Sequence, residues 1–194
     1  TGDYHENILT QEIYMLYNLV IMKNAVFYDR DGIIVQMVYD AEHGTIDVVR
    51  KKEEVEFVPG IIELLKYTHG FGYLNIIISN QSVIALGKTS KENFDELTKM
   101  LLQKIEKLDA IIDADYYCFH HPFAKIDKYR MDCDCRKPKP GMIEQAAKEF
   151  DIELSQSWMI GDGVNDVKAG MAAGCRTILL GNLMESEYLR VLEQ

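Results

Sequence analysis

The chain has 194 residues, of which 47% are hydrophobic, and its 31 acidic and 21 basic residues give a formal net charge of -10. This length suits one globular domain, which buries roughly 70% of the surface that its unfolded chain would expose. A net negative charge repels nucleic acid and anionic lipid, so neither is an expected partner. An anionic substrate would need positive charge supplied by its own binding site.

No apolar run approaches the length of about 18 residues that a membrane span needs, and the N-terminus lacks a signal-peptide pattern. We therefore expect a cytoplasmic protein. Residues 1–21 carry apolar residues at helical spacing and predict an extra amphipathic helix or a linker from an upstream domain. Such a helix would contact that domain or a partner, and residues 22–194 would form a single domain.

Continuous apolar runs predict strands at residues 25–28, 74–79, 158–160 and 177–180, with helices over 61–69, 90–108 and 142–150. Runs without polar alternation are typical of strands covered on both faces. The pattern favours an α/β class with a Rossmann-like parallel sheet and helices on both faces. Between residues 34 and 59, a polar stretch containing Gly44 predicts a short hairpin, which is a candidate substrate flap.

The first predicted strand ends in Asp29-Arg30-Asp31-Gly32. Ligands of open α/β sheets bind beyond the carboxyl ends of the strands, where these two carboxylates emerge. Residues two apart on an extended segment point to the same side, and two close carboxylates suit a nucleophile beside a metal ligand or an acid and base. Taken alone, the same motif is also typical of a turn.

Three more polar motifs follow in chain order: hydroxyl and amide donors suited to phosphate oxygens, a pair of cations, and an acidic turn. They are Ser79-Asn80-Gln81-Ser82, Arg136-Lys137-Pro138, and Gly161-Asp162-Gly163 with Asp166 shortly after it. Each motif alone could be a turn, a solvated charge pair or a helix cap. Their joint occurrence in this order favours one phosphate-binding site.

In this order the four motifs resemble the haloacid dehalogenase (HAD) superfamily of phosphotransferases. More narrowly, the chain looks like the D-glycero-D-manno-heptose 1,7-bisphosphate phosphatase and histidinol-phosphatase branch. The similarity covers roughly residues 22–181. Its most specific part is Cys118-Phe119-His120-His121-Pro122, followed by Cys133-Asp134-Cys135-Arg136-Lys137-Pro138. The resemblance implies a HAD-like fold with a minimal cap, a flap hairpin and a zinc-bound loop.

The resemblance also implies roles for the acidic residues. Asp29 would attack phosphorus to form an aspartyl-phosphate, and Asp31 would protonate the leaving oxygen and then activate water. Asp29, the backbone carbonyl of Asp31 and Asp162 would hold Mg²⁺. Asp166 matches the second acidic position of the last motif and could contact the metal indirectly.

The substrate-binding residues follow from the same resemblance. Ser79 and Lys137 would bind the transferring phosphoryl oxygens, and Arg136 would recognise the rest of the substrate. The other candidate phosphate-binding residues are Asn80, Gln81, Ser82 and Gly163.

The cysteine segment predicts a second metal. Cys118 and His120 are one residue apart, as are Cys133 and Cys135, and twelve residues separate the pairs. Three thiolates and one imidazole can close a tetrahedral structural Zn²⁺ site, with reduced thiols or a disulfide as the alternatives. The family pattern favours His120 over the adjacent histidine as the ligand. The site would clamp the loop that delivers the two cations.

Departures from the family pattern surround the substrate pocket. Val83-Ile84-Ala85-Leu86-Gly87 stands where the family has Gly-Ile-Ala-Arg-Gly, and Gly163 replaces a frequent Lys. The expected function is hydrolysis of a small sugar phosphate, with the 7-phosphate of D-glycero-D-manno-heptose 1,7-bisphosphate as the leading substrate and histidinol phosphate as the second. A weakly active partner-binding domain is the alternative from another class, and the intact acidic motifs argue against it.

Overall fold

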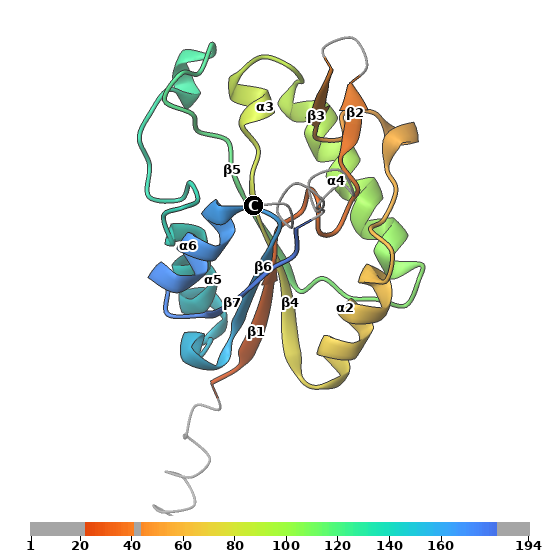
Figure 1. Cartoon of the computed structure of the whole chain (residues 1–194), viewed down its shortest axis with the longest axis vertical. Coiled ribbons are helices and arrows are strands. Elements are labelled where there is room, and N and C mark those ends of the chain that lie inside the picture. The colour runs from red at the N-terminus through yellow and green to blue at the C-terminus, as the bar shows by residue number, and fades with distance from the viewer. Residues whose placement is uncertain (1–21, 41–43, 182–194) are drawn as a thin grey trace, which may run out of the picture.

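The computed structural model describes residues 22–40 and 44–181 (Figure 1). The helix predicted within residues 1–21 lies outside the described residues. Within the described ranges, every helix is too short or too polar to span a lipid bilayer.

A five-stranded sheet forms the centre of the fold, and all of its strand pairs are parallel. Across the sheet the strands are β5 (Ala114–Cys118), β4 (Tyr73–Asn80), β1 (Asn24–Tyr28), β6 (Trp158–Gly161) and β7 (Arg176–Leu179). Because β1 is the central strand, the residues that follow it emerge between the ends of β4 and β6. This topology decides which motifs can meet.

Helices cover both faces of the sheet (Figure 1). On one face α2 (Ile61–Gly70) and α4 (Lys91–Glu106) pack against the β1 side chains of Val26 and Tyr28. On the other face α5 (Gly141–Phe150) and α6 (Val164–Ala172) pack against Ala25 and Phe27. Successive strand side chains point to opposite faces, so β1, which is apolar without alternation, is buried on both, as predicted. The prediction is wrong for β7, whose residues are mostly exposed because it lies at the edge of the sheet.

Short elements complete the chain. The helix α3 (Ser82–Ala85) follows β4, and three 3₁₀ turns lie at η1 (Lys52–Glu54), η2 (Asp127–Tyr129) and η3 (Leu154–Gln156). The predicted hairpin is confirmed, and it consists of the antiparallel strands β2 (Val38–Asp40) and β3 (Thr45–Asp47). It stands at the end of the molecule where the sheet strands have their carboxyl ends (Figure 1).

The strand β5 was not among the predicted strands. Its sequence, Ala-Asp-Tyr-Tyr-Cys, has no continuous apolar run because β5 is an edge strand whose residues are mostly only half-buried. The four predicted strands and three predicted helices are confirmed, with their ends shifted by one or two residues.

Candidate active site and cysteine cluster

Three neighbouring strands bring the predicted motifs together. Asp29 follows β1, Ser79 and Asn80 end β4, and Asp162 follows β6. Since β4, β1 and β6 are adjacent and parallel, their carboxyl ends meet at one edge of the sheet. Motifs that are far apart in the sequence therefore converge on one small volume, as in other open α/β sheets.

Lys137 joins this volume from the loop before α5. Its Nζ lies 3.0 Å from Oδ1 of Asp29 and 2.5 Å from Oδ1 of Asp166, and it donates to the Ile78 carbonyl at 2.8 Å. Burial by itself lowers the pKa of this lysine, but the two carboxylates outweigh that effect, so its pKa is raised. A fixed positive charge therefore stands directly beside Asp29.

Asn80 holds the backbone of that lysine. Its Nδ2 donates to the Lys137 carbonyl at 3.0 Å, and its Oδ1 accepts from the Lys137 N–H at 3.0 Å. The amide oxygen and the amide nitrogen of Asn80 thus both bind the backbone of one residue. These two hydrogen bonds connect the end of β4 to the loop that carries Lys137.

Asp31 is the more deeply buried carboxyl group of the first motif, with 7% exposure. Gln81 donates from Nε2 to its Oδ2 at 2.5 Å, and Oδ1 has no partner within the described residues. Burial raises the pKa of Asp31, and the Arg30 guanidinium offsets part of that effect. A carboxyl group with a raised pKa is suited to donate a proton.

Asp29, Asp162 and Asp166 present carboxylate oxygens that all lie within 4.8 Å of one another. Burial, followed by the charges of Asp29 and Asp166, raises the pKa of Asp162 to about 6. Crowded carboxylates of this kind fit a hard divalent cation, which takes oxygen ligands and removes the repulsion. The turn at Gly32 leaves no room for a side chain, because a Cβ there would lie 2.1 Å from Asp162 Oδ2.

The other predicted phosphate-binding residues lie around this centre. Ser79 is buried, and its Oγ accepts from Gln81 Nε2 at 3.1 Å. Ser82 opens α3 and is half-buried. Gly163 donates its N–H to Asp166 Oδ2 at 3.0 Å. The Arg136 guanidinium donates from Nη1 to the His120 carbonyl at 3.1 Å, so it is attached to the cysteine segment.

The cysteine segment folds into a compact cluster of four potential ligands, namely Cys118, His120, Cys133 and Cys135. The Sγ atom of Cys135 lies 3.2 Å from Sγ of Cys118 and of Cys133, and 3.3 Å from Nδ1 of His120. Three thiols and one imidazole gathered in this way are compatible with a bound metal ion. The neighbouring His121 is used differently, because its Nδ1 accepts from the Phe123 N–H at 3.1 Å.

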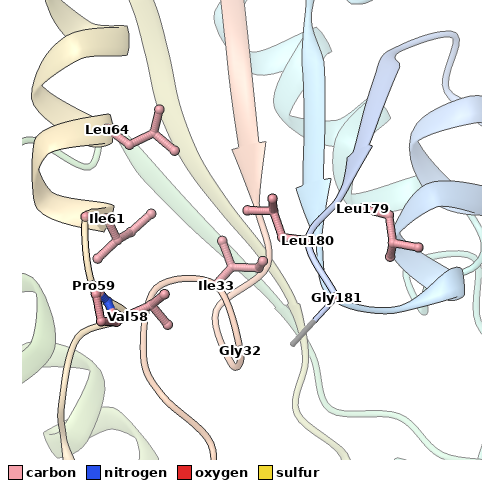
Figure 2. A pocket seen from close by; sticks show the side chains of 10 residues that line it. Gly32, Ile33, Val58, Pro59, Ile61, Leu64, Leu179, Leu180 and Gly181 are labelled. Carbon is pink, nitrogen blue, oxygen red and sulfur yellow. The ribbon is translucent and has the colours of Figure 1, made fainter. Parts of the chain in front are cut away.

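A separate apolar cavity of about 390 Å³ borders the Gly32 turn (Figure 2). Ile61 and Leu64 of α2 lie on one side of it, and Leu179 and Leu180 at the end of β7 lie on the other. The described residues that line this cavity are all uncharged. The charged groups of the predicted motifs lie instead in the carboxylate cluster.

Comparisons with known proteins agree with this geometry. Residues 134–185 match the HAD-hydrolase-like protein family. The chain is 39% identical over 159 residues to D-glycero-beta-D-manno-heptose-1,7-bisphosphate 7-phosphatase from Pasteurella multocida (strain Pm70), covering 82% of each chain. It is 35% identical over 156 residues to the protein of the same name from Escherichia coli (strain K12), covering 80% of this chain and 78% of that protein. The chain belongs to the HAD-like phosphatases.

The fold of this HAD-like phosphatase agrees with a solved structure. The crystal structure of D,D-heptose 1,7-bisphosphate phosphatase from B. bronchiseptica, complexed with magnesium and phosphate, superposes with a TM-score of 0.69 at 24% identity. The similarity covers 88% of this chain and 87% of that chain. The HAD-like fold predicted from the motifs is therefore confirmed. The relatives at 35–39% identity show that the chain is a phosphoric monoester hydrolase.

Two residues of the HAD-like phosphatase have larger parts in the site than the sequence suggested. Asp166 completes the carboxylate cluster and pairs with Lys137, and its signal was the acidic position shortly after Asp162. Arg30 is 1% exposed, and its guanidinium carbon lies 5.0 Å from the Phe94 ring centroid. The sequence feature that could have indicated this role is the position of Arg30 between two aspartates at the end of a predicted strand.

Proposed function

We propose that this phosphatase removes the 7-phosphate from D-glycero-β-D-manno-heptose 1,7-bisphosphate through an aspartyl-phosphate on Asp29. The observation that carries the proposal is the ion pair of Asp29 with Lys137 beside the buried Asp31. This ion pair lies at the edge of the sheet where the four motifs meet. The curated relatives at 35–39% identity are named for this substrate and this anomer, which supports the choice of sugar.

Asp29 is proposed as the nucleophile. Its carboxylate attacks phosphorus, the bond from phosphorus to the sugar oxygen breaks, and Asp31 gives its proton to the departing oxygen. Asp31, now ionised, takes a proton from the water that attacks the aspartyl-phosphate. This second step releases inorganic phosphate and restores both carboxyl groups. The adjacent ammonium group of Lys137 stabilises the negative charge that develops on the phosphoryl oxygens.

Mg²⁺ is the proposed cofactor. Asp29, Asp162 and the backbone carbonyl of Asp31 would hold it, and it would neutralise the carboxylates and the phosphate together. Asp166 is proposed to act differently, because Lys137 and the Gly163 N–H already occupy its carboxylate oxygens. We assign Asp166 to the positioning of the lysine.

Zn²⁺ is proposed as a structural ion held by the four residues of the cysteine cluster, Cys118, His120, Cys133 and Cys135. Two features support this role. Cys118 is the last residue of β5, and the N–H of Gly141, the first residue of α5, donates to the Asp134 carbonyl at 3.1 Å. The cluster would thus hold Arg136 and Lys137 in place between a strand and a helix.

The remaining substrate contacts are proposals from the same geometry. Ser79 and Lys137 would bind the transferring phosphoryl group, and Arg136 would face the rest of the sugar phosphate. Leu86 provides no charge at the position where the pattern of the resembling family has Arg. The nearby Lys88 is paired with Asp47 of the flap at 2.8 Å.

The test is phosphate release from a panel of phosphomonoesters with Mg²⁺, including both anomers of heptose 1,7-bisphosphate and histidinol phosphate. We expect the highest kcat/KM on the β anomer of the heptose bisphosphate and no turnover by Asp29→Asn. Higher kcat/KM on histidinol phosphate would reject the proposed substrate. An absence of phosphate release from every ester would reject the catalytic role of the whole site and favour a partner-binding domain.

A further inference from the structure

Gln81 is buried at the centre of the site, with 1% exposure, although it belongs to the segment expected to bind phosphate. Its Nε2 donates to Asp31 Oδ2 at 2.5 Å and to Ser79 Oγ at 3.1 Å. A primary amide has two N–H bonds, and both are used by these two acceptors. The side chain therefore has no donor left for a phosphoryl oxygen.

The backbone of Gln81 is fixed as firmly as its side chain. The Gln81 N–H donates to the Cys118 carbonyl at 2.7 Å, which extends the pairing of β4 with β5 by one step. Gln81 is also the residue at which β4 gives way to α3. Its amide group therefore projects from a backbone position that two elements define.

We propose that Gln81 is a positioning residue that orients the carboxyl group of Asp31 for proton transfer to the leaving oxygen. The inference rests on the proposed function, in which Asp31 is the general acid and base. An amide N–H can only donate, so Asp31 Oδ2 is held as an acceptor. The proton that Asp31 delivers then resides on Oδ1, the oxygen that has no partner within the described residues.

Orientation of this kind matters because proton transfer requires the acid to lie within hydrogen-bond reach of the leaving oxygen. A positioned general acid contributes about 10²–10⁴-fold to a rate. Loss of the amide donor leaves the acid in place but free to rotate about its side-chain torsions. We therefore expect a partial loss, smaller than the loss caused by removing Asp31 itself.

The experiment compares two phosphate esters whose leaving groups differ in their need for a proton. A sugar oxygen needs one, whereas p-nitrophenolate departs without one. Gln81→Met keeps the side-chain length and removes both N–H bonds. We expect it to slow the first turnover of heptose 1,7-bisphosphate by about 30-fold, and that of p-nitrophenyl phosphate by less than about 3-fold, with KM nearly unchanged.

Gln36→Met is the matched control. Gln36 also donates an amide hydrogen bond, from Nε2 to the Phe57 carbonyl at 3.1 Å, but it is exposed. We expect this variant to match the wild type on both esters. If Gln81→Met still releases p-nitrophenolate in its first turnover, this result would also show that the variant folds and keeps its nucleophile.

Three results would overturn the inference: equal slowing on both esters, wild-type rates on both esters, or a raised KM with kcat unchanged. The last result would make Gln81 a substrate-binding residue. Asp31→Asn separates this failure from failure of the proposed function. If Asp31→Asn keeps the wild-type rate on the sugar ester, the assigned acid is wrong. If it loses that rate while Gln81→Met does not, only the role of Gln81 fails.

Discussion

The ammonium group of Lys137 lies 3.0 Å from Oδ1 of Asp29, although the two residues belong to motifs far apart in the sequence. Lys137 is 3% exposed and has Asp166 as a second carboxylate partner. The ion pair places a buried cation where a phosphoryl group would meet the nucleophile. Its removal should therefore affect both rate and stability.

We expect Lys137→Met to lower kcat by about 10²–10³-fold, because one preorganised charge that stabilises the transition state is lost. In magnesium-free buffer, the free energy of unfolding should fall by about 3 kcal/mol, since the buried carboxylate of Asp166 and the half-buried one of Asp29 lose their cation. Steady-state kinetics and urea denaturation measure the two effects. Lys139→Met is the control, because the two carboxylates that pair with Lys139 among the described residues, Asp132 and Asp134, are both exposed. Equal effects of the two substitutions would contradict the assigned role.

Gly32→Ala should weaken the binding of Mg²⁺ to the enzyme. Gly32 has a φ of 85°, and a Cβ would lie 2.1 Å from Asp162 Oδ2, so the new methyl group must displace a proposed metal ligand. Gly174 has the same φ but nothing within 4 Å of its Cβ position. Both substitutions should cost about 1 kcal/mol of backbone strain. Only Gly32→Ala should raise the Mg²⁺ concentration that gives half-maximal activity, by about 10-fold or more. If that concentration is unchanged, the result would argue against Asp162 as a ligand.

Cys133→Ala should abolish zinc binding and destabilise the protein. The wild-type protein should contain about one zinc ion per chain, and the variant almost none, as measured by elemental analysis of protein purified without added metal. The free energy of unfolding should fall by more than about 2 kcal/mol. Cys175→Ala is the control, because Cys175 is not one of the four residues of the cluster. Burial raises the pKa of Cys175 to about 12, so its thiol stays protonated. Zinc-free wild-type protein with normally titrating thiols would reject the site.

Asp162→Asn should stabilise the protein when magnesium is absent. The folded-state pKa of Asp162 is raised from 3.8 to about 6, so its ionised form costs stability at every pH above about 6. Asparagine removes that cost, and at pH 7.5 the free energy of unfolding should rise by about 1–2 kcal/mol. The difference should shrink as pH falls from 6 to below 3.8, where wild-type Asp162 is protonated in both states. Urea denaturation at pH 7.5 and at lower pH measures it.

Saturating Mg²⁺ should reverse that order of stability. The wild type gains binding free energy from a ligand that the asparagine variant has weakened. If Mg²⁺ stabilises both proteins equally, Asp162 is not a metal ligand. A variant that is less stable than the wild type in magnesium-free buffer would contradict the raised pKa.

Three of the four correctly predicted strands, β1, β4 and β6, are apolar runs that are largely buried, whereas β7 is a mostly exposed edge strand whose run is still apolar. The run at β1 is apolar throughout because helices cover both of its faces, and α5 begins at Pro140-Gly141, as its sequence indicates. The strand β5 escaped prediction because an edge strand that is half-buried need not be continuously apolar.

The amino-acid sequence by itself determined the α/β class, the order of four motifs, the family and the pairing of Cys-x-His with Cys-x-Cys. These features are local, and each follows from residue type and spacing. Tertiary structure decided the partners: Gln81 meets Asp31, Asn80 meets the Lys137 backbone, and Asp166 meets the Lys137 ammonium group. Donors and acceptors far apart in the chain find one another only after the β4, β1 and β6 ends converge, because strand order is a property of the folded sheet.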